Sequence, residues 1–80
     1  MEKTRAELLE MYSYVGPFVE GLACARKDGK EFHIRPDGTP AYEGRYEFVN
    51  PFQGGKALVY KNEECFYIRS DGTRVDGTNS

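Results

Sequence analysis

The chain has 80 residues, of which 39% are hydrophobic, 14% aromatic and 30% charged, a composition that excludes a disordered segment. At this length the chain forms one small domain, which buries only about 60% of the surface that the unfolded chain exposes. The formal net charge of -2 excludes a general attraction to phosphate backbones, so nucleic acid is not an expected partner.

The first 11 residues form the one helix that the sequence predicts. Thr4 and Glu7 have the spacing of a capping box, in which each side chain accepts a hydrogen bond from the backbone N–H group of the other residue. A helix this short is unstable alone in water, so we expect residues 1–11 to cap a neighbouring sheet. Its apolar side consists of Leu8, Leu9 and Met11.

The rest of the chain is a tandem repeat with a period of 34 residues. Repeat 1 covers residues 12–45 and repeat 2 covers residues 46–80, of which we expect residues 77–80 to be a frayed tail. A period of this length is typical of proteins built from stacked units. The 13 identical pairs are Tyr12/Tyr46, Val15/Val49, Pro17/Pro51, Phe18/Phe52, Gly21/Gly55, Ala23/Ala57, Lys27/Lys61, Phe32/Phe66, Ile34/Ile68, Arg35/Arg69, Asp37/Asp71, Gly38/Gly72 and Thr39/Thr73.

Each repeat is predicted to contain a β-hairpin. In repeat 1 a short strand over residues 12–15 and a loop over residues 16–21 precede two strands, over residues 22–27 and 30–35. Asp28-Gly29 joins the two longer strands as a two-residue turn, which fixes their register. The predicted facing pairs are Ala25 with Phe32 and Ala23 with Ile34 on one face, and Cys24 with His33 and Arg26 with Glu31 on the other.

Repeat 2 has the same predicted register around a turn at residues 62–63, with Val59 opposite Phe66 and Ala57 opposite Ile68. Because the Phe and the Ile recur in both units, the face that they share is the predicted core. The sequence therefore predicts a mostly β fold, in which two tandem 34-residue β-hairpin repeats form a small antiparallel sheet assembly with a short N-terminal capping helix.

The run from Phe18 to Ala23 reads Phe-Val-Glu-Gly-Leu-Ala, and an Asp-Gly turn follows at Asp37. Both features resemble the WG (tryptophan-glycine, KWG) repeat of bacterial proteins, whose signature is Phe-x-Glu-Gly-Leu-Ala with a closing Asp-Gly turn. The resemblance extends over residues 12–75, although Glu31-Phe32 and Cys65-Phe66 stand where that family has Trp-Gly. It implies an all-β repeat fold with a mostly non-catalytic role.

Two groups of side chains could indicate catalysis. Cys24 opposite His33 could be a nucleophile with its base, or half of a metal site. The pair has no third ligand nearby and no counterpart in repeat 2, so we expect a structural or surface role for it. Asp37 and Asp71 each precede a Gly in matched reverse turns, which explains both residues. We therefore predict that the chain is not an enzyme and holds no metal and no cofactor.

The hairpin face opposite the predicted core carries the candidate binding residues. In repeat 1, Arg26 and Glu31 are expected to form an ordinary surface ion pair of small energetic value. In repeat 2 the same face has too many apolar and aromatic side chains for a plain solvated surface, so we expect the N-terminal helix or another protein to cover it. The candidate partner-binding or ligand-binding residues are Leu58, Tyr60, Tyr67, Lys56, Arg69, Arg35 and His33.

These patterns favour a non-catalytic protein–protein interaction module, whose sheet edges are completed by self-association or by a protein partner. The alternative is a module that binds a glycan, a nucleotide or another anion through its aromatic and basic side chains. The cysteines lie outside any CxxC pair, and the sequence contains neither a signal-peptide pattern nor an apolar run of about 18 residues. We therefore expect a cytoplasmic protein that is not bound to a membrane.

Overall fold

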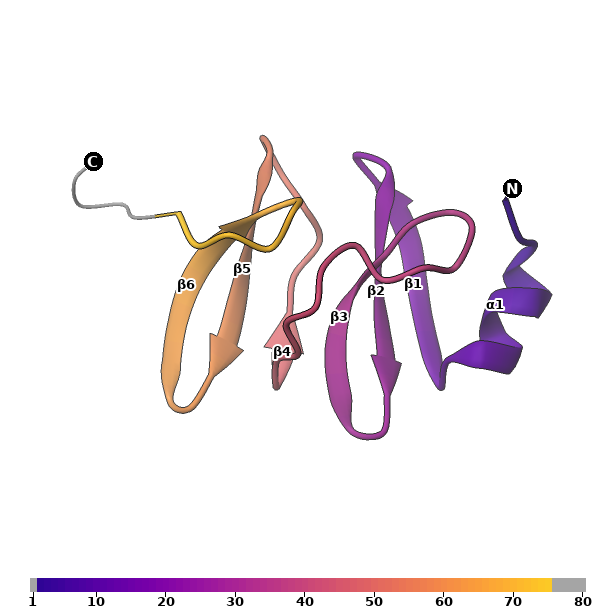
Figure 1. Ribbon diagram of the computed structural model, residues 1–80, viewed down its shortest axis with the longest axis horizontal. Coiled ribbons are helices and arrows are strands. Elements are labelled where there is room, and N and C mark those ends of the chain that lie inside the picture. The colour runs from indigo at the N-terminus through magenta and orange to yellow at the C-terminus, as the bar shows by residue number, and fades with distance from the viewer. Residues whose placement is uncertain (1, 76–80) are drawn as a thin grey trace.

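The computed structural model describes residues 2–75 of the chain (Figure 1). One short helix precedes two three-stranded antiparallel sheets, with strand orders β1-β2-β3 and β4-β5-β6. This arrangement confirms the predicted mostly β fold with two tandem hairpin units and an N-terminal helix. The elements in chain order are α1 (Arg5–Met11), β1 (Tyr14–Val19), β2 (Leu22–Lys27), β3 (Lys30–Ile34), β4 (Phe48–Val49), β5 (Lys56–Lys61) and β6 (Glu64–Arg69).

Helix α1 begins with the predicted capping box. The Thr4 hydroxyl accepts from the Glu7 N–H at 3.2 Å, and the Thr4 N–H donates to Glu7 Oε1 at 2.8 Å. Leu8 is the only residue of the helix that is buried, whereas Leu9 and Met11 stay exposed. The helix packs beside β1 at one end of the molecule (Figure 1). Of the two alternatives for the apolar face of repeat 2, covering by α1 is therefore wrong, and covering by another protein stays a prediction.

Strand β1 is longer than predicted, because the expected loop over residues 16–21 is mostly strand. Val15 and Phe18 both pair with β2, and the register shifts at Gly16-Pro17 between them. Proline has no N–H group to donate to the ladder, so this dipeptide produces a local irregularity without ending the strand. The turn itself contains only Glu20 and Gly21, whose φ angles of 54° and 84° are both positive.

The two hairpins have the predicted turns and registers. Residues 28–29 and 62–63 all have positive φ, as a two-residue hairpin turn requires. In each hairpin the small residues Ala23 and Ala57 lie opposite the two isoleucines of the core. Every facing pair expected from the turn spacing is present, so the register prediction is confirmed.

Each hairpin closes with the predicted reverse turn. The Asp37 carboxylate accepts from the Thr39 N–H at 2.9 Å and from the Thr39 hydroxyl at 2.6 Å. Asp71 accepts from Thr73 in the same way, at 3.0 and 2.7 Å. These hydrogen bonds from the threonine lower the pKa of each aspartate, and they confirm that both carboxylates belong to turns.

The core runs along the whole stack, and each unit contributes the face that was predicted to be buried. Phe32 and Ile34 are buried in repeat 1 and Ile68 in repeat 2, while Phe66 is half-buried. In both units a tyrosine from the start of the repeat meets the core Phe edge-on, with ring centroids 5.6 Å apart for Tyr12 and Phe32 and 6.0 Å for the pair in repeat 2.

A single β-bridge joins the two sheets. The Glu31 N–H donates to the Tyr46 carbonyl at 2.8 Å, and the Tyr46 N–H donates back at 3.0 Å. The Glu20 carboxylate adds a second link, because it accepts from the N–H groups of Gly54 and Gly55 at 2.7 and 3.0 Å. The units therefore follow one another along the long axis of a molecule that measures 41 × 23 × 18 Å (Figure 1).

Candidate functional site

The outer face of repeat 1 is an internal interface. His33 is 0% exposed, and its ring lies 4.4 Å from the ring of Phe52 in repeat 2. Its Nδ1 atom is 2.6 Å from the hydroxyl of Tyr42, and its Nε2 atom is 2.8 Å from the carbonyl of Asn50. The expectation that His33 belongs to an exposed binding face is wrong, because the segment that begins repeat 2 covers it.

The contacts of His33 assign its tautomer. Its backbone N–H donates to the Tyr42 hydroxyl at 3.1 Å, so that hydroxyl is free to donate its own proton to Nδ1. The protonated nitrogen is then Nε2, which donates to the carbonyl of Asn50. Burial lowers the pKa of His33, and the hydrogen bond to Asn50 opposes this effect only in part. The ring is neutral in the folded chain at pH 7.

This buried ring predicts a loss of stability in mild acid. The folded chain binds the His33 proton less readily than the unfolded chain, whose pKa is near 6.5. The unfolded state therefore takes up more protons as the pH falls below 6.5. We expect the free energy of unfolding to fall there, by at most about 1.4 kcal/mol per pH unit. Urea unfolding between pH 7.5 and 5.5 measures this slope.

The control for this measurement is His33→Gln, which keeps a donor and an acceptor but cannot titrate. His33 is the only histidine in the chain, so the slope should be flatter in the variant. A wild-type slope that equals the variant's slope, or an NMR titration that places the pKa of His33 above 6.5, would contradict the prediction.

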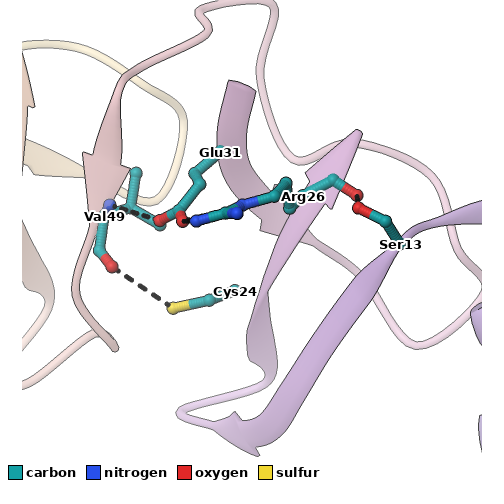
Figure 2. A network of polar contacts seen from close by, with 5 residues as sticks. All are labelled: Ser13, Cys24, Arg26, Glu31 and Val49. Carbon is teal, nitrogen blue, oxygen red and sulfur yellow. Dashed lines mark hydrogen bonds and ion pairs between the residues drawn. The ribbon is translucent and has the colours of Figure 1, made fainter. Parts of the chain in front are cut away.

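Glu31 is the second residue that holds the units together (Figure 2). One carboxylate oxygen accepts from Arg26, at 2.7 Å from Nη2 and 3.2 Å from Nε, and the other accepts from the Val49 N–H at 3.0 Å. Glu31 is 7% exposed. The predicted cross-strand pair of Arg26 and Glu31 is present, but it is not an ordinary surface pair, because the carboxylate is buried between the repeats and bonds to both of them.

Cys24 and His33 do not act on each other. The Cys24 thiol points toward the carbonyl of Val49 at 3.9 Å (Figure 2). The imidazole of His33 instead bonds to Asn50. Burial, with a smaller effect from the carboxylate of Glu31, raises the pKa of the Cys24 thiol to about 11. The thiol therefore stays protonated at neutral pH and is a poor nucleophile. No group of three or more His, Cys, Asp or Glu residues within 2–75 could hold a metal ion.

Among residues 2–75, no segment is stacked on the corresponding face of repeat 2. Tyr67 occupies the position of His33 and is 43% exposed, and Leu58 occupies the position of Cys24 and is half-buried. Tyr60 is 42% exposed and lies against Phe48, with ring centroids 5.8 Å apart. This surface is called the terminal face below, and its members are Lys56, Leu58, Tyr60, Cys65 and Tyr67.

A groove of about 720 Å³ lies along the terminal face. Lys56, Leu58 and Tyr67 of repeat 2 line it together with residues 50–53, and Val19 and Glu20 of repeat 1 complete the lining. The ammonium group of Lys56 lies 4.8 Å from the centre of the Tyr67 ring, within the range of a cation–π contact. Residues 50–53 were not among the predicted site residues. The Val-x-Pro-Phe motif that occurs at both 15–18 and 49–52 could have indicated them.

The two candidate arginines are engaged elsewhere. Arg69 donates to the Thr73 hydroxyl at 3.3 Å and to the Arg74 carbonyl at 3.1 Å. Arg35 makes the equivalent contacts in repeat 1, to the Thr39 hydroxyl at 3.3 Å and to the Pro40 carbonyl at 2.8 Å. Both side chains therefore hold closing turns. The structure gathers Lys56, Leu58, Tyr60 and Tyr67 on one surface and leaves Arg35 in repeat 1.

Helix α1 takes the place of a preceding repeat. Arg5 donates to the carbonyls of Val15 at 2.7 Å and Gly16 at 2.9 Å. One period later, the carbonyls of Val49 and Asn50 face the side chains of Cys24 and His33. The Arg5 guanidinium thus donates to two carbonyls of repeat 1, and the carbonyls at the same positions of repeat 2 are contacted by side chains of repeat 1. The N-terminal end of the stack is capped, whereas the terminal face has no such cover within residues 2–75.

Two units with one topology, one hairpin register and one closing turn, stacked along an axis, define a tandem β-repeat protein. The family described as WG containing repeat matches residues 8–30 and 34–65, and the chain belongs to this family. No curated protein and no solved structure matches the chain. Among residues 2–75 there is no helix with the length and apolar character needed to span a membrane.

Proposed function

We propose that this chain is a non-catalytic protein-binding module and that its partner docks on the terminal face. The supporting observation is the difference between two equivalent surfaces. Repeat 2 buries the outer face of repeat 1, around His33, while the same face of repeat 2 leaves Tyr67 43% exposed. A surface that repeats the residue positions of an internal interface, but that no segment of residues 2–75 covers, fits a role in binding.

The residue types of this face suit a protein partner. Tyrosines are among the residues that contribute most to binding energy, because a large ring buries apolar area at a low entropic cost. Tyr60 and Tyr67 lie with Leu58 on one sheet face, beside the groove. We also propose a cytoplasmic location, which the free thiols of Cys24 and Cys65 support.

The test is an affinity capture from a lysate of the source organism, with wild type, Tyr67→Lys and Tyr14→Lys as baits. Tyr14 is 53% exposed and lies in repeat 1, away from the terminal face. Tyr14→Lys therefore makes the same chemical change as Tyr67→Lys at a surface that the proposed partner does not contact. Both variants should stay within about 0.5 kcal/mol of wild type in urea unfolding, because neither removes a buried side chain.

We expect a stoichiometric protein that wild type and Tyr14→Lys retain and Tyr67→Lys loses, after nuclease treatment and in high salt. The same proteins recovered with all three baits would contradict the proposal, as would unfolding of Tyr67→Lys. Solution mass measured over a range of concentrations decides whether the partner is a second copy of the chain.

The second candidate function is binding of a glycan, a nucleotide or another anion, and the Lys56–Tyr67 contact beside the groove favours it. Since Arg35 and Arg69 hold turns, Lys56 is the cation that such a ligand would meet. Ligand binding that weakens strongly with salt and is lost in Lys56→Gln, but not in Arg35→Gln, would support this function over protein binding.

A further inference from the structure

We infer that the terminal face receives the N-terminal side of another WG repeat unit, which enters through its Val-x-Pro-Phe segment. This inference rests on the proposed function and specifies the chemistry of the partner. The interface between repeats 1 and 2 supports it, because the terminal face is the same surface one period later.

The groove on the terminal face corresponds to a site that is filled in repeat 1. There the ring of Phe52, from the second Val-x-Pro-Phe segment, packs against His33 at 4.4 Å and is 2% exposed. Tyr67 stands at the position of His33, and Lys56 and Leu58 line the groove beside it. A proline followed by an aromatic ring is therefore the side-chain pattern that the groove fits.

The backbone at the outer edge of β6 can form the same β-bridge that joins Glu31 to Tyr46. In a two-residue hairpin the pair beside the turn is hydrogen-bonded and the next pair is not, so the N–H and C=O groups of Glu31 point outward and bond to Tyr46. Cys65 holds the equivalent place opposite Tyr60. No residue among 2–75 pairs with the Cys65 backbone across this edge, which leaves one bridge for an incoming strand.

The terminal face is not identical to the interface that it repeats. Tyr67 replaces His33 and keeps a donor, its hydroxyl, for a carbonyl of the incoming segment. Gly54 replaces Glu20, the residue whose carboxylate links repeat 1 to the glycine turn of repeat 2. Cys65 replaces Glu31, whose carboxylate accepts from the Val49 N–H. Leu58 replaces Cys24, whose thiol faces the Val49 carbonyl. These links are missing, so we expect the docked unit to be held less tightly than repeat 2 is held by repeat 1.

The cap limits which units can dock. In this chain Arg5 occupies the carbonyls of Val15 and Gly16, the two groups that an incoming unit must present. A second copy therefore cannot dock head to tail while α1 stays in place. The partner is a chain whose WG unit carries a free N-terminal side.

The first test removes the α1 cap, so that the N-terminal side of repeat 1 in one copy of the chain is free to dock on another copy. Arg5→Glu replaces the donor with a carboxylate that the two carbonyls repel, and it should release the cap because only Leu8 of α1 is buried. We expect this variant to associate head to tail as its concentration rises, in light scattering after gel filtration, while wild type does not. Adding Tyr67→Lys should return it to a monomer. A folded Arg5→Glu chain that stays monomeric, or one whose association survives Tyr67→Lys, would overturn the inference.

The second test covers the case in which Arg5→Glu does not fold. Repeating residues 46–79 directly after Asn79 gives a chain of three units with the 34-residue spacing unchanged. We expect this chain to melt in one transition at a higher temperature than wild type. Tyr67→Lys should lower that temperature clearly, although it hardly changes the two-unit chain. Two separate transitions, or an equal effect of Tyr67→Lys in both chains, would overturn the inference.

The proposed function fails separately from this inference. If the captured partner is lost with Tyr67→Lys but neither test detects docking of a WG unit, the terminal face binds proteins of another kind. Only the inference is then overturned.

Discussion

Phe52→Ala should lower the free energy of unfolding by about 3 to 5 kcal/mol, the usual cost of removing a fully buried phenylalanine side chain. Phe52 is 2% exposed, and its ring packs against that of His33 across the boundary between the repeats. Domains of this size are stable by only about 5 to 15 kcal/mol, so the variant should be close to unfolding at 37 °C. Urea unfolding followed by far-UV circular dichroism measures the loss.

The matched control is Phe18→Ala, which makes the same change at the same position of repeat 1. Phe18 is 38% exposed, because α1 stands where a complete preceding repeat would lie. We expect the control to lose less than half as much stability as Phe52→Ala. Equal losses in the two variants would show that packing at the boundary between the repeats adds no stability at Phe52, and would contradict the stacking of the two units.

The hairpin registers could be predicted because the turn residues determine them. Asp28-Gly29 allows a two-residue turn with positive φ, and that turn fixes every facing pair in the strands beside it. The 34-residue period then carries the same register into repeat 2, although Asn62-Glu63 is a poorer turn sequence. Local chemistry and repetition were together sufficient for the fold.

The covering of the outer faces could not be predicted in the same way. Alternation along a strand separates two faces, but it does not say which neighbour packs on each of them. His33 and Tyr67 share one repeat position, yet one is buried and the other is 43% exposed, since within residues 2–75 a unit is stacked on that side of repeat 1 and none on that side of repeat 2. In a linear stack, position in the array decides burial as much as residue type does.

The role of Arg5 was hidden for a related reason. Its helix carries no identity with the end of repeat 1, so the alignment of the repeats does not reveal that it replaces a unit. The equivalence is one of hydrogen-bond donors. A guanidinium reaches the carbonyls of Val15 and Gly16, where a thiol and an imidazole reach those of Val49 and Asn50. A pattern of residue types cannot show that one donor takes the place of two others, but the structure shows it.

Glu31→Ala should be the second strongly destabilising change, because it removes a buried carboxylate that bonds to both repeats (Figure 2). The Val49 N–H loses its only side-chain acceptor at a buried position, and leaving such a donor unpaired costs about 1 to 3 kcal/mol. The bond to Arg26 adds little to this loss, since the Arg26 side chain is 53% exposed and partly solvated.

Glu31→Gln separates the two contributions, because glutamine keeps an oxygen that can accept from Val49 but has no charge for Arg26. We expect this variant to lose less than half of what Glu31→Ala loses in urea unfolding. Cys65→Ala, at the equivalent position of repeat 2, should be close to neutral, since Cys65 is exposed on the terminal face. If Glu31→Gln is as costly as Glu31→Ala, the loss comes from the ion pair with Arg26 inside repeat 1 and not from the Val49 bond, and the assignment of Glu31 as a backbone clamp between the repeats is wrong.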